Sequence, residues 1–370
     1  MNIKQRRLCF TRVLGEYTRS CLIVAYGIMV YHIDCGRLRS PRQLGRKKMW
    51  LQTRMFLLVA LLFGILYGVI TAIGTAVGGF NPIVFLILAF AFLGIQYLIG
   101  PSIVSWTMRI KWVSEKEAPE LHRIVAEQAE RARLPKPKVG VSQLSAAPPN
   151  AFAFGRTHGD GRVCVTPAIL RLLSKDELQA VIGHEISHIK HRDMVVITLL
   201  SAIPLIMYWI ALSFMFRGMF GGGRGSAGYV VLIGLGAFVL YFITNLLVLY
   251  GSRIREYYAD RGSVRLGNEP HHMATALYKL VYGNARYKGR EELKEIEGVK
   301  AFFINDPSRA WNEVRELSQV DLDMSGTIDP DELAVLRSKT LRLSSQDKMM
   351  EILSTHPNML KRIQHLSSLM

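Results

Sequence analysis

Cysteine is scarce in this sequence, since the 370 residues include only four. Cys9, Cys21 and Cys35 lie in a basic N-terminal segment, Cys164 lies in an apolar stretch, and no C-x-x-C pair occurs. This spacing excludes a disulfide framework, and a reducing compartment is the simplest assumption. A cleavable signal peptide is also lacking, because the apolar segment CLIVAYGIMVY is short, begins late and has no convincing cleavage site.

Charge is missing from three long segments, residues 55–108, 194–216 and 226–252, which contain no Lys, Arg, Asp or Glu. The first segment is interrupted at 78–82 by GGFNP, which is typical of a turn between helices. Each resulting tract reaches the roughly 20 residues that a helix needs to cross a bilayer. We therefore expect four membrane helices, two in 49–108 and two in 194–252.

A deeply buried hairpin of a soluble protein is the alternative for the later pair of tracts. Polar residues that could line a protein interior recur along it, namely Thr198, Ser201, Ser213 and Asn245. The first pair offers much less support for that alternative.

The formal net charge is +17, from 46 basic and 29 acidic residues. In a membrane protein such an excess indicates topology before it indicates nucleic acid, and no nucleic-acid partner is expected. Residues 1–48 are rich in Lys and Arg, which keeps the N-terminus in the cytoplasm. Two pairs of spans then return the chain to that side, so that all substantial polar segments face the cytoplasm. We interpret residues 1–48 as a basic extension that is weakly structured or comes from an upstream start.

Between the two pairs of tracts, the sequence predicts a surface helix followed by a small sheet. Apolar residues recur at helical spacing after residue 115, and Pro135 ends that pattern. Short extended segments follow at 138–141, 150–155 and 162–167, separated by Pro and Gly turns. Ser174 and Glu177 then have the spacing of a capping box, which predicts a helix that contains the sequence HEISH.

The segment HEISH places two imidazoles on one face of that helix, since His184 and His188 are four residues apart. With Glu185 beside the first histidine, it forms the H-E-x-x-H pattern of zinc peptidases, in which the histidines bind zinc and the glutamate is the general base. His191 is excluded as a ligand beside His184. A rise of about 1.5 Å per residue places the two about 10 Å apart along the helix.

The third ligand is expected after the last apolar tract. Glu256 and Asp260 lie four residues apart in the segment SRIREYYADRGSV, on a further predicted helix. Glu256 can bind the metal while Asp260 orients a ligand histidine from behind. Two crossings separate His188 from Glu256, so both lie on one side of the membrane. The alternative, a solvated charged helix end, remains open on spacing alone.

Four segments in order, PNAFAFG, HEISHIKHRD, SRIREYYADRGSV and STHPNMLKRI, resemble the HtpX-type membrane metallopeptidases, relatives of the type I CAAX prenyl endopeptidases. The resemblance covers the chain from about Met49 to its end. It implies a gluzincin fold in which His184, His188 and Glu256 bind one Zn²⁺ and Glu185 activates water. It further implies that His356 acts at the active site, and that a substrate backbone aligns on the strand that contains Asn150, Ala151, Phe152 and Ala153.

A second metal loop is predicted at residues 321–332, where DLDMSGTIDPDE matches the calcium loop of an EF-hand. Gly326 stands at the turn, and Ile328 provides the apolar anchor between helices predicted at 309–320 and 330–338. An acidic surface loop that binds calcium weakly or not at all is the alternative, because such loops usually occur in pairs. The candidate ligands are Asp321, Asp323, Ser325, Thr327, Asp329 and Glu332.

The predicted fold is a multi-pass, mainly α-helical membrane protein with an α+β zincin-type catalytic domain and a small sheet. Its predicted parts are a basic extension at 1–48, two transmembrane helices in 49–108 and the first part of the catalytic domain, with the H-E-x-x-H helix, at 109–193. Two further membrane helices in 194–252 and the second part of the catalytic domain at 253–370, which includes the EF-hand-like loop 321–332, complete the chain.

The predicted function is a membrane-bound zinc endopeptidase at the cytoplasmic face of the cell membrane, in contact with lipids and polypeptide substrates. The resemblance alone implies that it cleaves damaged or misassembled membrane proteins. The alternatives are a CAAX-type processing peptidase for lipid-modified peptides and a non-catalytic, calcium-responsive membrane scaffold. Glu185 speaks against the scaffold, because a structural zinc site needs no base.

Overall fold

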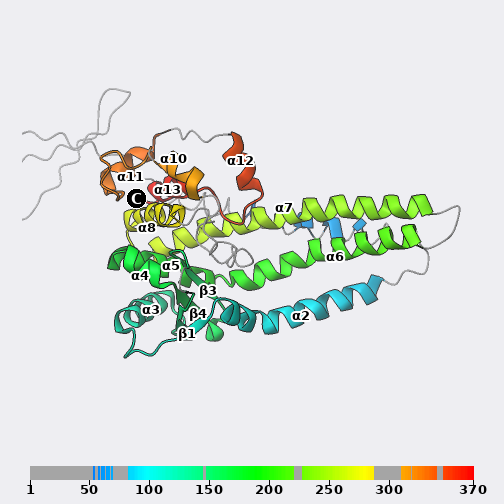
Figure 1. Ribbon diagram of the computed structural model, residues 1–370, viewed down its shortest axis with the longest axis horizontal. Coiled ribbons are helices and arrows are strands. Elements are labelled where there is room, and N and C mark those ends of the chain that lie inside the picture. Colours follow the sequence, from blue (N-terminus) through cyan, green and yellow to red (C-terminus); the bar gives the residue numbers. More distant parts are fainter. Residues whose placement is uncertain are drawn as a thin grey trace, which may run out of the picture. The chain divides into compact units, whose positions relative to one another are not determined.

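The computed structural model describes residues 82–144, 147–220, 227–286, 310–317, 319–339 and 345–370, together with parts of 53–69 (Figure 1). The chain divides into two units, Met1–Arg54 and Met55–Met370, and all elements named below belong to the second. The predicted basic extension, residues 1–48, and most of the predicted turn at 78–82 lie outside the described residues.

The sheet has four strands in the order β1-β2-β4-β3. They are β1 (Ile110–Trp112), β2 (Lys138–Ser142), β3 (Ala151–Phe154) and β4 (Arg162–Val165). β2 and β4 are parallel, and the two outer pairs are antiparallel. The three strands predicted from the sequence are confirmed within a residue or two. β1 was missed, because three residues are too few to show an alternating pattern.

The two faces of β3 differ in side-chain size and in what they contact. Ala151 and Ala153 belong to a core with helices α3 (Pro119–Ala132) and α5 (Lys175–Lys190). Phe152 and Phe154 alternate with them and pack on the other side, against residues at the end of α2 (Pro82–Thr107). The small residues let α5 approach the strand closely, and α5 is the helix that contains HEISH.

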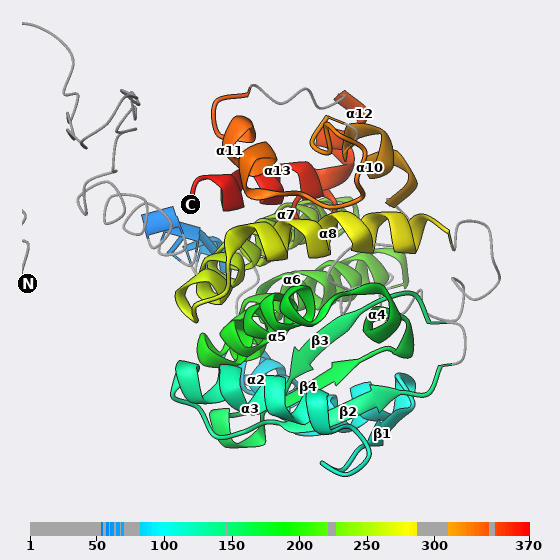
Figure 2. The ribbon, with the colours of Figure 1, turned by 90° about the vertical axis from the view of Figure 1, so that its left-hand side faces the viewer.

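α5 begins as the capping box predicted. The Ser174 side chain accepts a hydrogen bond from the Glu177 amide, and the Glu177 carboxylate accepts one from the Ser174 amide. Figure 2 shows α5 over the sheet, α8 (Pro270–Ala285) beyond α5, and a further layer of short helices beyond α8. These short helices are α10 (Ala310–Leu317), α11 (Pro330–Leu336) and α13 (Met359–Ser367). Two further helices lie elsewhere: α4 (Pro167–Leu172) links β4 to α5, and α12 (Ser345–Ile352) packs near α7.

Two helices in the described part of the chain are long and apolar enough to cross a membrane. They are Asp193–Met219 in α6 (Asp193–Phe220) and Gly228–Arg265 in α7 (Ala227–Arg265), which run side by side (Figure 1). Only 17% of the most apolar window of α7 is buried. That exposure disagrees with the alternative of a deeply buried soluble hairpin. The spans predicted in 49–108 stay a prediction.

α7 continues without a break through Glu256 and Asp260, so the prediction of a separate helix after the apolar tract was wrong. It packs tightly on α5 where each helix has a glycine facing the other. A Cβ atom on Gly262 would lie 2.3 Å from Ser187 Oγ, and one on Gly183 would lie 2.9 Å from Ser263 Oγ. The absence of both side chains lets the two helices come close enough for their polar residues to meet.

Candidate active site

Three potential metal ligands from α5 and α7 converge in the interior. The Nε2 atoms of His184 and His188 are 3.1 Å apart, and Glu256 places one oxygen 3.6 Å from the first and the other 3.5 Å from the second. Ligands on a tetrahedral zinc ion with bonds of about 2.0–2.1 Å lie about 3.4 Å apart. The three side chains therefore fit a zinc ion without rearrangement.

Both histidines are oriented by a carboxylate on the other side of the ring. His184 Nδ1 lies 2.9 Å from Asp260 Oδ1, and His188 Nδ1 lies 2.7 Å from Asp193 Oδ2. An N–H donated from Nδ1 leaves the lone pair on Nε2, which is the atom that points to the other ligands. The two carboxylates thus select the tautomer that binds metal.

The contribution of Asp193 was missed in the sequence, although the motif HEISHIKHRD ends with it. Asp193 is the first residue of α6, and Arg192 before it has φ of 54°, in the left-handed region. This turn brings the Asp193 carboxylate back toward His188. An ion pair with Arg255 of α7 holds the other oxygen of Asp193.

Arg362 of α13 was also missed, and it is fully buried. Its guanidinium donates to both oxygens of Asp260, over 2.6 and 3.0 Å, and lies 3.1 Å from Glu256 Oε2. α13 begins at a cap in which the Asn358 side chain accepts from the Leu360 amide. The sequence signal for Arg362 was its place in the segment STHPNMLKRI.

Glu185 lies between the candidate metal ligands and the edge strand β3. Burial raises the pKa of its carboxyl group, against the opposing effect of the neighbouring histidines and of a hydrogen bond from the Ala153 amide. A raised pKa suits a general base that must hold a proton part of the time. Without metal, burial opposes the charged form of His184, but the carboxylates of Asp260 and Glu256 outweigh it and raise its pKa to about 9. Metal binding at Nε2 would therefore release a proton.

The predicted substrate strand lies at the edge of the described sheet, next to the same base. Ala151, Phe152 and Ala153 are in β3, and Asn150 immediately precedes it. Asn150 is anchored to β4 through Thr166, whose Oγ1 accepts a hydrogen bond from the Asn150 amide. β3 pairs with β4 along one edge, and its Ala151 and Ala153 side chains pack toward α5.

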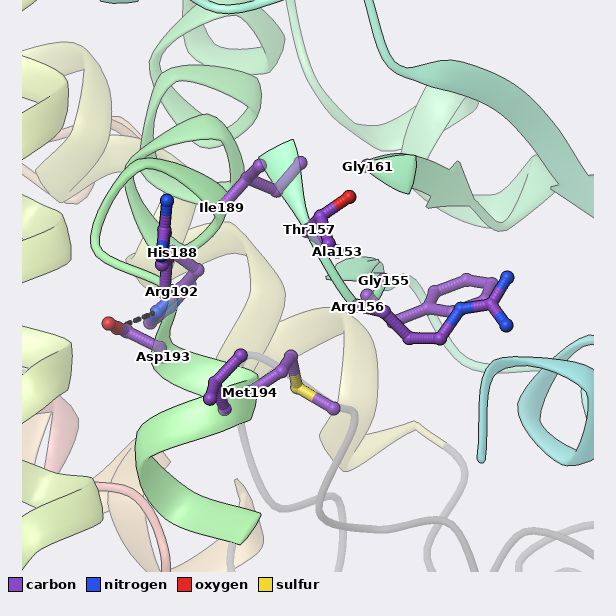
Figure 3. A pocket seen from close by; sticks show the side chains of 12 residues that line it. Ala153, Gly155, Arg156, Thr157, Gly161, His188, Ile189, Arg192, Asp193 and Met194 are labelled. Atoms are coloured by element: carbon purple, nitrogen blue, oxygen red, sulfur yellow. Dashed lines mark hydrogen bonds and ion pairs between the residues drawn. The ribbon is translucent and has the colours of Figure 1, made fainter. Parts of the chain in front are cut away.

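A small pocket opens beside His188, between the end of β3 and the start of α6. Figure 3 shows Ile189 and Met194 at its apolar wall, with Arg156 and Arg192 at its margin. The dashed contact in the view joins His188 to Asp193. The pocket therefore adjoins the metal ligands at the level where α6 leaves the catalytic region.

His356 lies beside the ligand cluster, on the segment that leads into α13. Its Nδ1 atom is 3.4 Å from Glu256 Oε2, and only 8% of the residue is exposed. Neither ring nitrogen has a hydrogen-bond partner within the part of the chain that the structure describes. His191, in contrast, lies outside the ligand cluster and contacts the ring of Tyr258.

All the site residues described above lie within a part of the chain that matches a known protein family. Residues 115–370 match the family model described as "Peptidase family M48". The chain belongs to peptidase family M48. It is therefore a metalloprotease, as H-E-x-x-H predicted, and the resemblance to HtpX-type peptidases is confirmed.

Curated relatives of this M48 peptidase extend over most of its length. A "Protease HtpX homolog" of Methanothermobacter thermautotrophicus is 51% identical over 245 residues, which cover 66% of this chain and 91% of that protein. A "Protease HtpX homolog" of Moorella thermoacetica is 39% identical over 279 residues, which cover 75% of this chain and 91% of that protein. The crystal structure of S. mikatae Ste24p is 16% identical, covers 88% of this chain and 67% of that chain, and has a TM-score of 0.46.

The EF-hand-like loop of the M48 peptidase lies between α10 and α11. Asp321, Asp323 and Glu332 each bring a carboxylate oxygen within 4.8 Å of the others. Gly326 has φ of 81° at the turn, as the sixth loop position requires. The other candidate calcium ligands make hydrogen bonds within the loop. The Ser325 hydroxyl donates to the Thr327 carbonyl oxygen, and the Asp329 carboxylate accepts from the Glu332 amide at the start of α11.

Proposed function

We propose that this M48 peptidase is a zinc-dependent endopeptidase embedded in the cell membrane, with His184, His188 and Glu256 as the zinc ligands. The single observation that carries the proposal is the geometry of these residues. Three donor groups lie 3.1–3.6 Å apart, and each histidine is turned by a carboxylate to present Nε2. Zinc in this position supplies a Lewis acid that polarises a peptide carbonyl and acidifies water.

Glu185 is the general base in this proposal. Its burial raises its pKa, so the carboxylate can take a proton from the attacking water and later pass the proton to the leaving amine. His356 is the second catalytic residue. Its buried ring contacts Glu256 through Nδ1, and Nε2 has no hydrogen-bond partner among the described residues, so an N–H from Nε2 can stabilise the oxyanion that forms at the scissile carbonyl.

The substrate backbone is proposed to bind as an added strand along β3. No described strand pairs with the second edge of β3, and the Ala153 amide hydrogen-bonds Glu185, the proposed base. An extended peptide on this edge would pass Glu185 and lead toward the pocket beside His188. Ile189 and Met194 in that pocket favour an apolar side chain next to the cleaved bond.

The site is proposed to face the cytoplasm, and the substrates are proposed to be damaged or misassembled membrane proteins. The basic N-terminal segment supports the orientation. Asp193 begins α6, and Glu256 follows the apolar part of α7, so the ligands lie at the same end of both helices. A substrate that leaves the membrane at that end reaches the pocket directly. α2, whose apolar side chains Ile87, Phe90 and Ile95 are exposed, is proposed as a third span.

A processing peptidase for lipid-modified, CAAX-type peptides is the alternative. This alternative function requires that cleavage depend on the lipid group of the substrate. A matched pair of peptides, one prenylated and one with the free cysteine, distinguishes a processing peptidase from a quality-control protease. Preference for an unmodified unfolded protein favours quality control, whereas cleavage of the prenylated peptide alone favours processing.

We also propose that the loop at 321–332 binds Ca²⁺. The sequence places oxygen ligands at the first, third, fifth, seventh, ninth and twelfth positions, and the three carboxylates converge. Calorimetry on the full chain with Ca²⁺ and with Mg²⁺ tests this proposal. The variant Glu332→Gln should lose the Ca²⁺ signal, while Glu130→Gln, an exposed change on α3, should retain it. No Ca²⁺ signal in the wild type would exclude the site.

The zinc proposal is tested by chelation followed by add-back. Purified protein is treated with a zinc-selective chelator, assayed on casein, and assayed again after Zn²⁺ is restored. Activity should disappear and return. The Glu256→Gln variant should bind less zinc, while Glu130→Gln should match the wild type. Activity that survives complete zinc removal would contradict the proposal.

A further inference from the structure

α12 and the residue after it present a run of exposed apolar side chains. The exposed fractions are 63% for Met349, 40% for Met350, 50% for Ile352 and 52% for Leu353. Glu351 among them points inward, where it is buried and paired with Lys361. A dense apolar run of this kind on an otherwise polar segment indicates a contact with something other than water.

The position of α12 indicates what that contact is. Arg253 of α7 donates hydrogen bonds from Nη1 to the Ile352 and Ser354 carbonyl oxygens, over 3.0 and 2.7 Å. Arg253 is the first charged residue after the apolar tract 226–252, and its guanidinium lies 5.8 Å from the ring centre of Tyr250. Tyrosine followed by arginine is typical of the level where a spanning helix leaves the hydrocarbon. Arg253 therefore holds the end of α12 at that boundary.

The apolar surface of α12 continues into that of α7. Arg253, Tyr250, Ile243 and Val239 follow one another at spacings of three, seven and four residues, which lie on one helical face. Tyr250, Ile243 and Val239 are 36%, 42% and 54% exposed. Figure 1 shows α12 running across α7 rather than along it. A helix that crosses a spanning helix at the boundary lies in the plane of the membrane surface.

We propose that α12 is a membrane-surface helix, with Met349, Met350, Ile352 and Leu353 immersed at the boundary between headgroups and acyl chains of the bilayer that α6 and α7 cross. This inference rests on the proposed membrane location. It has a consequence for the site, because Leu353 is only three residues before His356. The lipid contact fixes the segment that positions His356 beside Glu256.

The test places a polarity-sensitive fluorophore at chosen positions of the full chain. The background carries Glu185→Gln to prevent autolysis, and its four cysteines are replaced by serine or alanine. Single changes Met349→Cys and Leu353→Cys report on α12. Phe242→Cys, in the apolar part of α7, is the lipid control, and Met324→Cys, where the side chain is 90% exposed in the calcium-loop segment, is the water control. Each labelled protein is reconstituted in phosphatidylcholine vesicles, with brominated lipid as the membrane quencher and iodide as the aqueous quencher.

If α12 lies in the membrane surface, the probes at 349 and 353 should emit at shorter wavelength than the probe at 324. Brominated lipid should quench them, as it quenches the probe at 242. Quenching of the 349 and 353 probes by iodide alone, with the 242 probe still quenched by lipid, would overturn the α12 inference and leave the membrane location intact. Protection from both quenchers would also overturn it, because the face would then be covered by protein, such as a second copy. Iodide quenching at all four positions would overturn the membrane location as well.

Discussion

His188 Nδ1 lies 2.7 Å from Asp193 Oδ2, so a proposed zinc ligand on α5 is oriented by the first residue of a candidate membrane helix. Arg255 of α7 pairs with the same carboxylate. The geometry of the proposed zinc site therefore depends on where both apolar helices begin and end, and not only on the H-E-x-x-H segment.

Asp193→Asn should weaken zinc binding by about 10–100-fold, because a neutral amide no longer fixes the Nε2 lone pair of His188 toward the metal. The affinity is measured by competition with a chromophoric chelator, which does not depend on activity. Asp176→Asn, an exposed change near the start of α5, is the control and should leave the affinity unchanged. Equal affinities in both variants would show that Asp193 does not orient the ligand.

Arg362→Leu should destabilise the protein by about 3–5 kcal/mol, since it leaves the buried carboxylate of Asp260 without its bidentate partner. Arg123→Leu removes an exposed arginine whose ion pair with Glu120 is screened by solvent, so this control should unfold as the wild type does. Thermal unfolding in detergent compares the two variants. A midpoint for Arg362→Leu as high as that for Arg123→Leu would contradict the role given to Arg362.

Gly262→Ala should force α5 and α7 apart, because the added Cβ atom would lie 2.3 Å from Ser187 Oγ. Overpacking of this kind typically costs about 1–3 kcal/mol. Combining it with Ser187→Gly should restore part of the stability. Gly236→Ala, where nothing lies within 4 Å of the new Cβ, is the matched change on α7 and should be neutral. Failure of the double variant to recover would mean that the contact with Ser187 is not the cause.

His191 should make the metal-free protein lose stability as the pH falls. Burial and the nearby Arg255 lower its folded-state pKa to about 4, below the unfolded value of about 6.5. The unfolded chain therefore binds the proton first, and the contribution is complete above about pH 6.5 and is lost as the pH falls toward 4. His191→Gln should flatten the pH dependence of the unfolding midpoint in this window. An unchanged slope would exclude His191 as its source.

Much of the site could be predicted from the sequence because its main residues lie at helical spacing. His184, Glu185 and His188 share one turn of α5, and Glu256 and Asp260 share one turn of α7. The structure brings these two turns together. Asp193 and Arg362 could not be predicted in the same way, because their roles depend on a left-handed turn at Arg192 and on the packing of α13.

The fold was less fully predictable where elements are short or joined. β1 has three residues, and α12 has an apolar run too short to suggest a surface helix. α7 was expected as two helices, because charged residues begin at Arg253 although the helical backbone continues to Arg265. A change in polarity along one helix marks a change of surroundings and not an end of the helix.

The most direct test of the account compares zinc content and casein cleavage of the wild type with those of Glu185→Gln. Glutamine preserves the size of the side chain but cannot take a proton from water. We expect one zinc ion per chain in both proteins, with cleavage by the variant reduced by at least about 100-fold, the lower end of what a general base contributes. Cleavage by Glu185→Gln at the wild-type rate, with zinc bound, would contradict it.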